Sequence, residues 1–272
     1  ASAGQTGPAA QQALPPEYAK LARVLGDMSP RAKDAIPNGD PAAFLADLQA
    51  VLSEDEAFVR AVTGGASAPA ASAGGGPVPG ESLLYLCDKG HYLPQGYQPP
   101  GLVRLEANDA YNVNRSNLYL RADVEPALRE MGRAARADGI TLLASSTYRS
   151  YDYQITVYNR LVAIDGQEQA DRESARPGTS QHQLGVAVDF GSVSDDFADT
   201  AMGQWVYAHS EEFGWSLSFP QGYEDVTGFR WESWHFRYIG KTACDFQRRW
   251  FSDVQQFMIE FIDAWKAQGA DS

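Results

Sequence analysis

The sequence predicts an α+β fold in which helices flank an antiparallel β-sheet, with a small helical segment added at the N-terminus. Helix-like and strand-like segments mix between residues 81 and 241 without the regular strand–helix–strand alternation that builds parallel sheets. Residues 64–80 are almost wholly Gly, Ala, Ser and Pro. In the segment before residue 64 and in the segment after residue 241, apolar residues recur at three- and four-residue steps, which is typical of amphipathic helices.

The N-terminal segment, residues 1–63, is predicted to form three short helices. The first follows the Pro15-Pro16 pair, and the second begins at Asp40-Pro41. Ser53-Glu54-Asp55-Glu56 has the form of a capping box and is expected to open the third. The apolar positions of these helices are Tyr18, Leu21, Leu25, Phe44, Leu48, Val51, Leu52, Phe58 and Val62. Three helices of this size make a poor core alone, so we expect them to dock on another part of the chain or on a second copy.

Residues 64–80 carry too little apolar surface to order themselves and are predicted to be a flexible linker. The main domain follows at residues 81–241. Residues 242–272 lie beyond it, and within them 242–268 are predicted to form one long amphipathic helix. The stripe of this helix consists of Phe246, Trp250, Val254, Phe257, Phe261 and Trp265. We expect it to pack against the N-terminal helices as a helical subdomain, within one chain or across a dimer.

The main domain is predicted to contain three helices and four strands. The first helix ends at Gly139 and the third at Gly214, because glycine adopts the left-handed conformation that stops a helix. In chain order the elements are a helix at 122–138, a strand at 140–145, a helix at 150–164, a strand at 185–190, a helix at 199–213 and strands at 215–219 and 234–239.

Composition narrows the function classes. The formal net charge of the 272 residues is -13, which argues against a nucleic-acid-binding protein, because such a protein would present a basic face. No apolar run approaches the roughly 20 residues that span a bilayer. The chain opens ASAGQTGPAAQQA, with neither an initiator Met nor an export signal, which fits a mature exported chain and equally a trimmed intracellular one.

The segment from Ser180 to Asp189 carries the first candidate metal ligands. His182 and Asp189 offer an imidazole and a carboxylate, which suit a borderline metal such as zinc. The two residues are an odd number of positions apart, so a straight strand would point them to opposite faces. Gly185 lies between them, and we expect it to bend the chain so that both side chains reach one site.

A second segment, Trp231 to Tyr238, completes the candidate set. His235 would give a His-Asp-His group with a fourth position left open, which is the arrangement of catalytic zinc sites. Glu232, three residues earlier, is placed to act as general base for the attacking water. The aromatic residues Trp234, Phe236 and Tyr238 alternate to the opposite face of the strand.

The remaining histidines and the two cysteines are expected to be structural. His209 belongs to the apolar face of its predicted helix, and His91 lies in a loop with no carboxylate partner at ligand spacing. Neither Cys87 nor Cys244 has the C-x-x-C neighbour that would indicate a structural metal site. They could form one disulfide in an oxidising compartment or remain two buried thiols.

The two motifs together resemble the VanY-type D-alanyl-D-alanine carboxypeptidases of the LAS group of zinc peptidases. S-x-H-x-x-G-x-A-x-D covers residues 180–189, and E-x-W-H covers 232–235. Residues 146–154 are similar to the S-x-Y-R-S-x-x-x-Q segment of the family, and 86–94 to its opening strand and loop. The resemblance covers about residues 83–241.

The resemblance implies a LAS/hedgehog-like peptidase fold and a Zn²⁺ cofactor held by His182, Asp189 and His235. Glu232 would be the catalytic base, and Arg149 would bind the terminal carboxylate of the substrate or the developing oxyanion. Ser180 and Gln154 match positions that line the pocket, although Gln154 could instead cap local structure. Cys87 departs from the small apolar or polar residue expected there, which favours the disulfide with Cys244.

By this resemblance, the expected function is removal of the terminal D-Ala from peptidoglycan stem peptides by an exported enzyme of the periplasm or cell surface. L,D-carboxypeptidase action on tetrapeptide stems is the nearest alternative, and D,D-dipeptidase action a further one. A different class of alternative is a binding module on the same fold, against which the intact Glu232 argues. The helical segments outside the resemblance could instead cover the active site.

Overall fold

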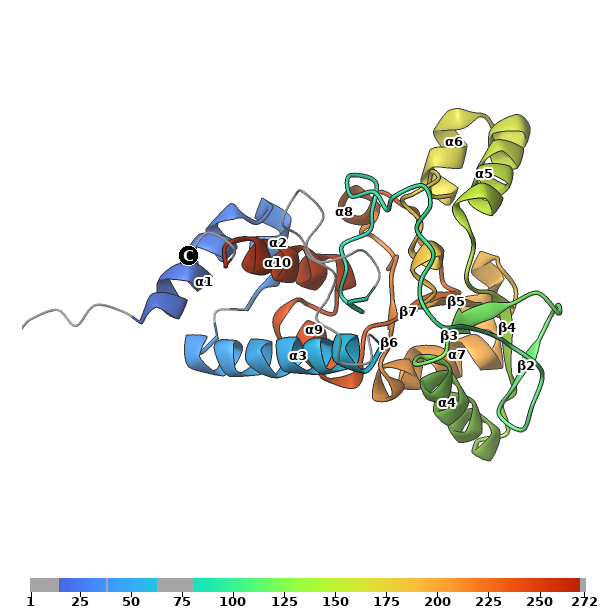
Figure 1. Cartoon of the computed structure of the whole chain (residues 1–272), viewed down its shortest axis with the longest axis horizontal. Helices are drawn as coiled ribbons and strands as arrows, with labels where there is room; N and C mark the ends of the chain where they lie inside the picture. Colours follow the sequence, from blue (N-terminus) through green and yellow to red (C-terminus); the bar gives the residue numbers. More distant parts are fainter. Residues whose placement is uncertain (1–14, 38, 63–80, 270–272) are drawn as a thin grey trace, which may run out of the picture.

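The computed structural model describes residues 15–37, 39–62 and 81–269. The linker predicted at 64–80 lies outside these residues. Figure 1 shows an elongated molecule with a group of helices from the two ends of the chain at one side and the mixed sheet-and-helix part at the other. No helix among the described residues is both long and apolar enough to span a membrane.

The core of the main domain is a five-stranded sheet with the strand order β2-β4-β5-β7-β6. The strands are β2 (Tyr111–Val113), β4 (Leu142–Ser146), β5 (Ala187–Phe190), β6 (Trp215–Leu217) and β7 (His235–Tyr238). The pairs β4–β5, β5–β7 and β7–β6 are antiparallel, as predicted, while β2 runs parallel to β4. A separate antiparallel ribbon joins β1 (Leu102–Arg104) to β3 (Tyr119–Arg121). The three short strands before residue 122 were not predicted, because three residues give no readable alternation.

The helices of the main domain lie close to their predicted positions. They are α4 (Glu125–Ala137), α5 (Tyr151–Asp165), α6 (Gln167–Glu173), α7 (Ala201–His209) and α8 (Glu224–Thr227), with 3-10 segments η1 (Gln181–Leu184), η2 (Asp195–Asp199) and η3 (Ser210–Phe213). Gly139 and Gly214, the predicted stops, both adopt positive φ. The short helices α6 and α8 were not predicted.

The prediction of a single C-terminal helix is wrong. The chain forms α9 (Lys241–Trp250) and α10 (Gln255–Ala267), separated by a turn in which Ser252 and Asp253 have positive φ of 50° and 61°. The apolar residues on either side of this turn, Phe251 and Val254, are both buried. Because the three- and four-residue spacing continues across the break, the sequence pattern did not reveal it.

The N-terminal segment contains three helices, but they are divided differently from the prediction. They are α1 (Pro16–Asp27), α2 (Pro30–Ala35) and α3 (Pro41–Val62). Ser53-Glu54-Asp55-Glu56 lies inside α3 and opens no new helix, so the capping-box interpretation is wrong. The signal that was missed is Ser29-Pro30, where the Ser29 side chain accepts a hydrogen bond from the Ala32 amide at the start of α2.

The N-terminal helices pack on the two C-terminal helices within one chain, as expected. The Phe44 ring on α3 lies at the centre of this contact, 5.2 Å from the ring centroids of Phe246, Trp250 and Phe261. Polar contacts flank the rings: the Trp250 indole donates to Asp47 at 2.7 Å, and Lys266 lies 2.9 Å from Asp55. α3 lies against α9 and α1 lies against α10, whereas Phe257 of the stripe packs on Tyr223 of the main domain.

The two cysteines do not form the disulfide that was considered. Cys87 and Cys244 are both buried, free thiols. Burial raises the pKa of the Cys87 thiol to about 12 and that of Cys244 well above its usual value. Of the two alternatives left open by the sequence, the structure has the pair of buried thiols.

Candidate active site

The bend expected at Gly185 brings His182 and Asp189 together. His182 lies in η1, Gly185 follows with a φ of 71°, and Asp189 lies on β5. A side chain at position 185 would also be crowded, since a Cβ there would lie 3.0 Å from Pro99. Because the chain turns at this point, His182 Nε2 reaches within 3.2 Å of Asp189 Oδ2.

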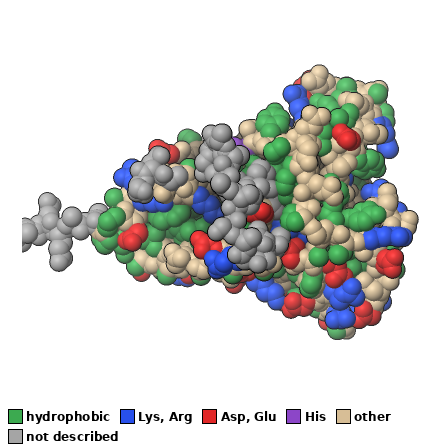
Figure 2. Space-filling view, in the orientation of Figure 1, with side chains coloured by type: hydrophobic (Ala, Val, Ile, Leu, Met, Phe, Trp, Pro, Cys, Tyr) green, Lys and Arg blue, Asp and Glu red, His purple; other side chains and the backbone are tan. Residues whose placement is uncertain are grey.

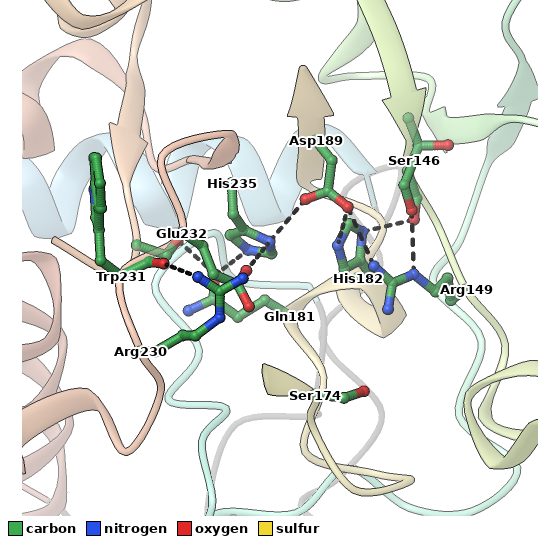
Figure 3. Close-up of polar contacts among 12 residues, drawn as sticks. Ser146, Arg149, Ser174, Gln181, His182, Asp189, Arg230, Trp231, Glu232 and His235 are labelled. Atoms are coloured by element: carbon green, nitrogen blue, oxygen red, sulfur yellow. Dashed lines mark hydrogen bonds and ion pairs between the residues drawn. The ribbon is translucent and has the colours of Figure 1, made fainter. Parts of the chain in front are cut away.

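The sheet supplies the third member of the group. Asp189 lies directly opposite His235 on β7, and Ser146 on β4 lies opposite Asp189 on its other side. His235 Nδ1 is 3.0 Å from Asp189 Oδ1. One ligand atom from each of His182, Asp189 and His235 lies within 4.8 Å of the others, and all three side chains are buried. Figure 3 shows the Asp189 carboxylate between the two imidazole rings.

Each imidazole is oriented by a partner on the far side of its ring. His182 Nδ1 lies 2.7 Å from the Thr147 carbonyl, to which it donates, so Nε2 faces Asp189 as an acceptor. His235 Nε2 lies 3.2 Å from Gln181 Oε1, so Nδ1 faces Asp189. Metal-binding histidines are held in this way by a second polar partner, which sets the tautomer and the ring direction.

The group fits a zinc ion. His182 Nε2 and Asp189 Oδ1 are buried atoms without a hydrogen-bond partner in the described part of the chain, which is costly unless a bound group satisfies them. Two imidazole nitrogens and a carboxylate oxygen are ligands that zinc prefers, and a catalytic zinc site uses three protein ligands. Three converging ligand atoms, two of them unsatisfied, therefore match the donor set of such a site.

The protonation states also suit a metal. Burial and the nearby Arg149 lower the pKa of His182 to about 4, so its imidazole is neutral at neutral pH. Burial alone would raise the pKa of Asp189, but His182 and His235 outweigh it and hold that pKa well below its usual value. A neutral imidazole and an ionised carboxylate are the forms that bind a metal.

Arg149 is held beside the candidate ligands by three side chains. Its guanidinium lies 3.2 Å from Asp189 Oδ2 and donates to Ser146 Oγ at 3.2 Å and to Gln154 Oε1 at 3.1 Å. Gln154 is fully buried and donates in turn to Ser174 and to the Ala175 carbonyl. Gln154 is not among the described residues that line the cavities at this site, so the expectation that it lines the substrate pocket is corrected. It positions Arg149 from behind.

Glu232 lies just before β7 and next to the same group. Its carboxylate is 3.7 Å from His235 Nδ1 and is mostly buried. Burial, followed by the negative charge of Asp189, raises the pKa of Glu232 to about 8. A carboxyl group with a pKa near neutrality can both take and return a proton.

Two cavities meet at these residues. The inner cavity, about 50 Å³, is lined by His182, His235 and Ser180, with Phe219 and Phe229 among its apolar walls. The outer cleft, about 360 Å³, is more open and is bordered by Asp189 and by α5. Arg149 and Glu232 line both cavities. The predicted base and the predicted carboxylate-binding residue therefore stand where the two cavities join.

Several contributors to the site were missed by sequence reasoning. Gln181 and Thr147 orient the two imidazoles, and both lie beside residues that the motifs singled out. Gln256 comes from α10, outside the recognised segment, and lines the inner cavity while donating to Asp88 at 2.8 Å. No local signal marks Gln256, because only the packing of α10 brings it to the cavity.

The other two histidines lie outside the site. His91 Nδ1 is 2.7 Å from the carboxylate of Asp88, so the expectation that it has no carboxylate partner is wrong. His209 lies against the Trp205 ring and 2.9 Å from Glu212, as an element of α7 rather than a ligand. Both side chains are substantially exposed, and neither joins the group around Asp189.

Comparison with known proteins places this site in a family. Residues 117–241 match the sequence model of VanY, D-alanyl-D-alanine carboxypeptidase. YodJ of Bacillus subtilis, a candidate carboxypeptidase, is 35% identical over 169 residues, which are 60% of this chain and 62% of that protein. The chain thus spans about six tenths of the length of this curated relative.

Two solved structures are similar. The LD-carboxypeptidase LdcB is 31% identical with a TM-score of 0.59, over 67% of this chain and 86% of that chain. A variant of the vancomycin-resistance D,D-pentapeptidase VanY in complex with Zn(II) is 28% identical with a TM-score of 0.50, over 59% and 90%. Residues 117–241 therefore form a domain of the VanY type, and this matched segment contains the whole His-Asp-His group.

Proposed function

We propose that the chain is a zinc-dependent carboxypeptidase that removes the terminal D-Ala from pentapeptide stems of peptidoglycan. The observation that carries the proposal is the convergence of His182, Asp189 and His235, two of whose buried ligand atoms have no hydrogen-bond partner among the described residues. The similar VanY structure was solved in complex with Zn(II). The accompanying proposal is that the enzyme is exported and works in the cell envelope, where its substrate lies.

The residues around the group supply the steps of hydrolysis. His182, Asp189 and His235 would hold a zinc ion, which would supply Lewis-acid chemistry. Glu232 takes a proton from the attacking water and returns it to the leaving D-alanine amine. Arg149, held by Gln154 and Ser146, binds the terminal carboxylate of the peptide, which makes the enzyme an exopeptidase.

A second candidate is L,D-carboxypeptidase action on tetrapeptide stems. The similarity to the LD-carboxypeptidase LdcB favours it, since that structure has the higher TM-score of the two. The same ligands, base and arginine would serve either substrate. The choice depends on the residues that line the inner cavity, such as Ser180 and Gln256.

Mass spectrometry of products separates these functions. Purified wild-type protein with zinc is incubated with tetrapeptide and pentapeptide stems, and the mass loss is read for each. Loss of one alanine from the pentapeptide alone supports the D,D activity, and loss from the tetrapeptide alone supports the L,D activity. If neither stem changes mass while both bind, the chain is a binding module and the enzymatic proposal fails.

A further inference from the structure

Two arginines of the outer cleft have no partner among the residues that the structure describes. Arg115 lies between β2 and β3, Arg160 lies on α5, and both line the cleft. Neither forms an ion pair or a hydrogen bond with any residue that the structure describes. On α6, by contrast, Arg172 is paired with Glu224. Arg115 and Arg160 are exposed, so their guanidinium groups are available to a ligand.

The walls of the cleft do not neutralise this charge. Its acidic residues are Asp189, Glu232 and Glu173. The first two belong to the group at the junction of the cavities, and Glu173 lies 3.4 Å from Arg230. In a chain with a net charge of -13, two unpaired arginines in one cleft form a local positive site. A guanidinium group in such a position is suited to a carboxylate, which it can bind with two hydrogen bonds.

The rest of the cleft fits a peptide. Tyr153, Val157 and Leu161 recur along α5 and give one apolar wall, and Val193 contributes from beyond β5. The Tyr153 side chain is 45% exposed and Val193 54%, so this wall is open. Figure 2 shows a notch beside the part formed by α5 and α6, with blue side chains on both sides of it. Apolar contacts and two cationic groups would together bind an extended acidic peptide.

The sizes of the two cavities indicate which part of the substrate lies here. A carboxypeptidase releases a single residue and retains the remainder of the peptide. The inner cavity, about 50 Å³, is the smaller and more enclosed of the two, whereas the outer cleft is about 360 Å³ and more open. The outer cleft therefore takes the residues on the N-terminal side of the scissile bond.

We propose that Arg115 and Arg160 bind a free carboxylate on the N-terminal side of the scissile bond and thereby select acidic peptides. This inference rests on the proposed carboxypeptidase function. The proposed preference for acidic peptides depends on two exposed residues of this chain. The similarity to known proteins does not by itself imply that preference. Two exposed contacts of this kind together change kcat/KM by about tenfold, mainly through KM.

The test uses two peptides that end in D-Ala-D-Ala and differ only in one upstream residue, which carries either a carboxylate or its amide. The full-length wild type is compared with Arg115→Gln, Arg160→Gln and the double variant. The matched control is Arg23→Gln, since Arg23 on α1 is also exposed and unpaired among the described residues but lines neither cavity.

The expected result is a preference of about tenfold in kcat/KM for the acidic peptide, which the double variant loses and the control keeps. Raised ionic strength should weaken the preference in the wild type. Equal cleavage of both peptides by the wild type, or an unchanged preference in the double variant, would overturn the inference. If the wild type cleaves neither peptide, the proposed D,D-carboxypeptidase activity has failed instead, and calorimetric binding of the same two peptides decides the role of the arginines.

Discussion

Asp189 and His235 are direct cross-strand partners on β5 and β7, with Asp189 Oδ1 3.0 Å from His235 Nδ1. The ligand geometry is therefore fixed by strand register, because a shift of one residue would turn one of the two side chains to the other face of the sheet. The aromatic residues Trp234 and Phe236, which flank His235 along the chain, are buried and hold that register.

If Gln181 orients the His235 ring, loss of its side-chain amide should lower the affinity of the protein for zinc. Gln181→Leu removes the acceptor at His235 Nε2, and loss of such a partner lowers metal affinity by about 10- to 100-fold. Competition with a coloured chelator measures the change. Gln183→Leu is the control, because it removes a buried amide from the same 3-10 segment without touching either imidazole. Equal zinc affinity for Gln181→Leu and the wild type would show that Gln181 does not orient a ligand.

A substitution of Glu232 should impair catalysis but leave zinc binding unchanged. Glu232→Gln keeps the size of the side chain but cannot accept the proton, so kcat should fall by about 10²- to 10⁴-fold while zinc content stays at the wild-type level. Steady-state kinetics and metal analysis of the same sample check both expectations. The exposed Glu212→Gln serves as control. A Glu232→Gln protein as active as the wild type would exclude the proposed base.

The helical subdomain is expected to contribute stability rather than cover the active site. No described residue between 15 and 62 lines the inner cavity or the outer cleft. Phe44→Ala should lower the free energy of unfolding by about 3–5 kcal/mol, because it leaves a cavity among three aromatic rings. Denaturant titration measures the loss, and the partly exposed Leu45→Ala should lose less. Activity of the folded Phe44→Ala protein at low temperature should match the wild type; a rise would support a cover.

The partly buried carboxyl group of Glu211 should make stability depend on pH. Burial and the nearby Asp253 raise the pKa of Glu211 to about 8 in the folded protein, whereas the unfolded chain has its usual value near 4.5. The folded state then binds a proton that the unfolded state releases, so stability falls as the pH rises from about 4.5 through 8. Glu211→Gln should be more stable than the wild type by roughly 1–2 kcal/mol above pH 8, and similar to it below pH 5. Thermal unfolding at the two pH values tests this, and an equal difference at both would contradict it.

The sequence predicted the parts of the site that depend on local chemistry. His182, Gly185 and Asp189 lie within eight residues, so one glycine could be recognised as the bend that joins the two ligands. The order of the strands was not predictable, because it depends on contacts between distant segments, and so the placing of Ser146 opposite Asp189 was missed. Gln256 was missed for the same reason.

Other differences between the predicted and the observed helices arose where one sequence pattern is compatible with two structures. The apolar spacing of 242–268 is the same for one helix and for two helices joined by a turn, and only the positive φ at Ser252 and Asp253 separates them. Residues 53–56 have the composition of a helix start, yet they continue α3 because the apolar residues before and after them share one buried face. Whether Cys87 and Cys244 meet is likewise a question of tertiary packing.

The central claim, that His182, Asp189 and His235 hold a zinc ion on which hydrolysis depends, is tested most directly by removing and restoring the metal. Protein dialysed against a chelator should release no D-alanine from a pentapeptide stem, and one equivalent of zinc should restore the release. Asp189→Asn should remain folded, bind zinc weakly and regain no activity. Release of D-alanine at an unchanged rate by protein shown to be free of metal would contradict the account.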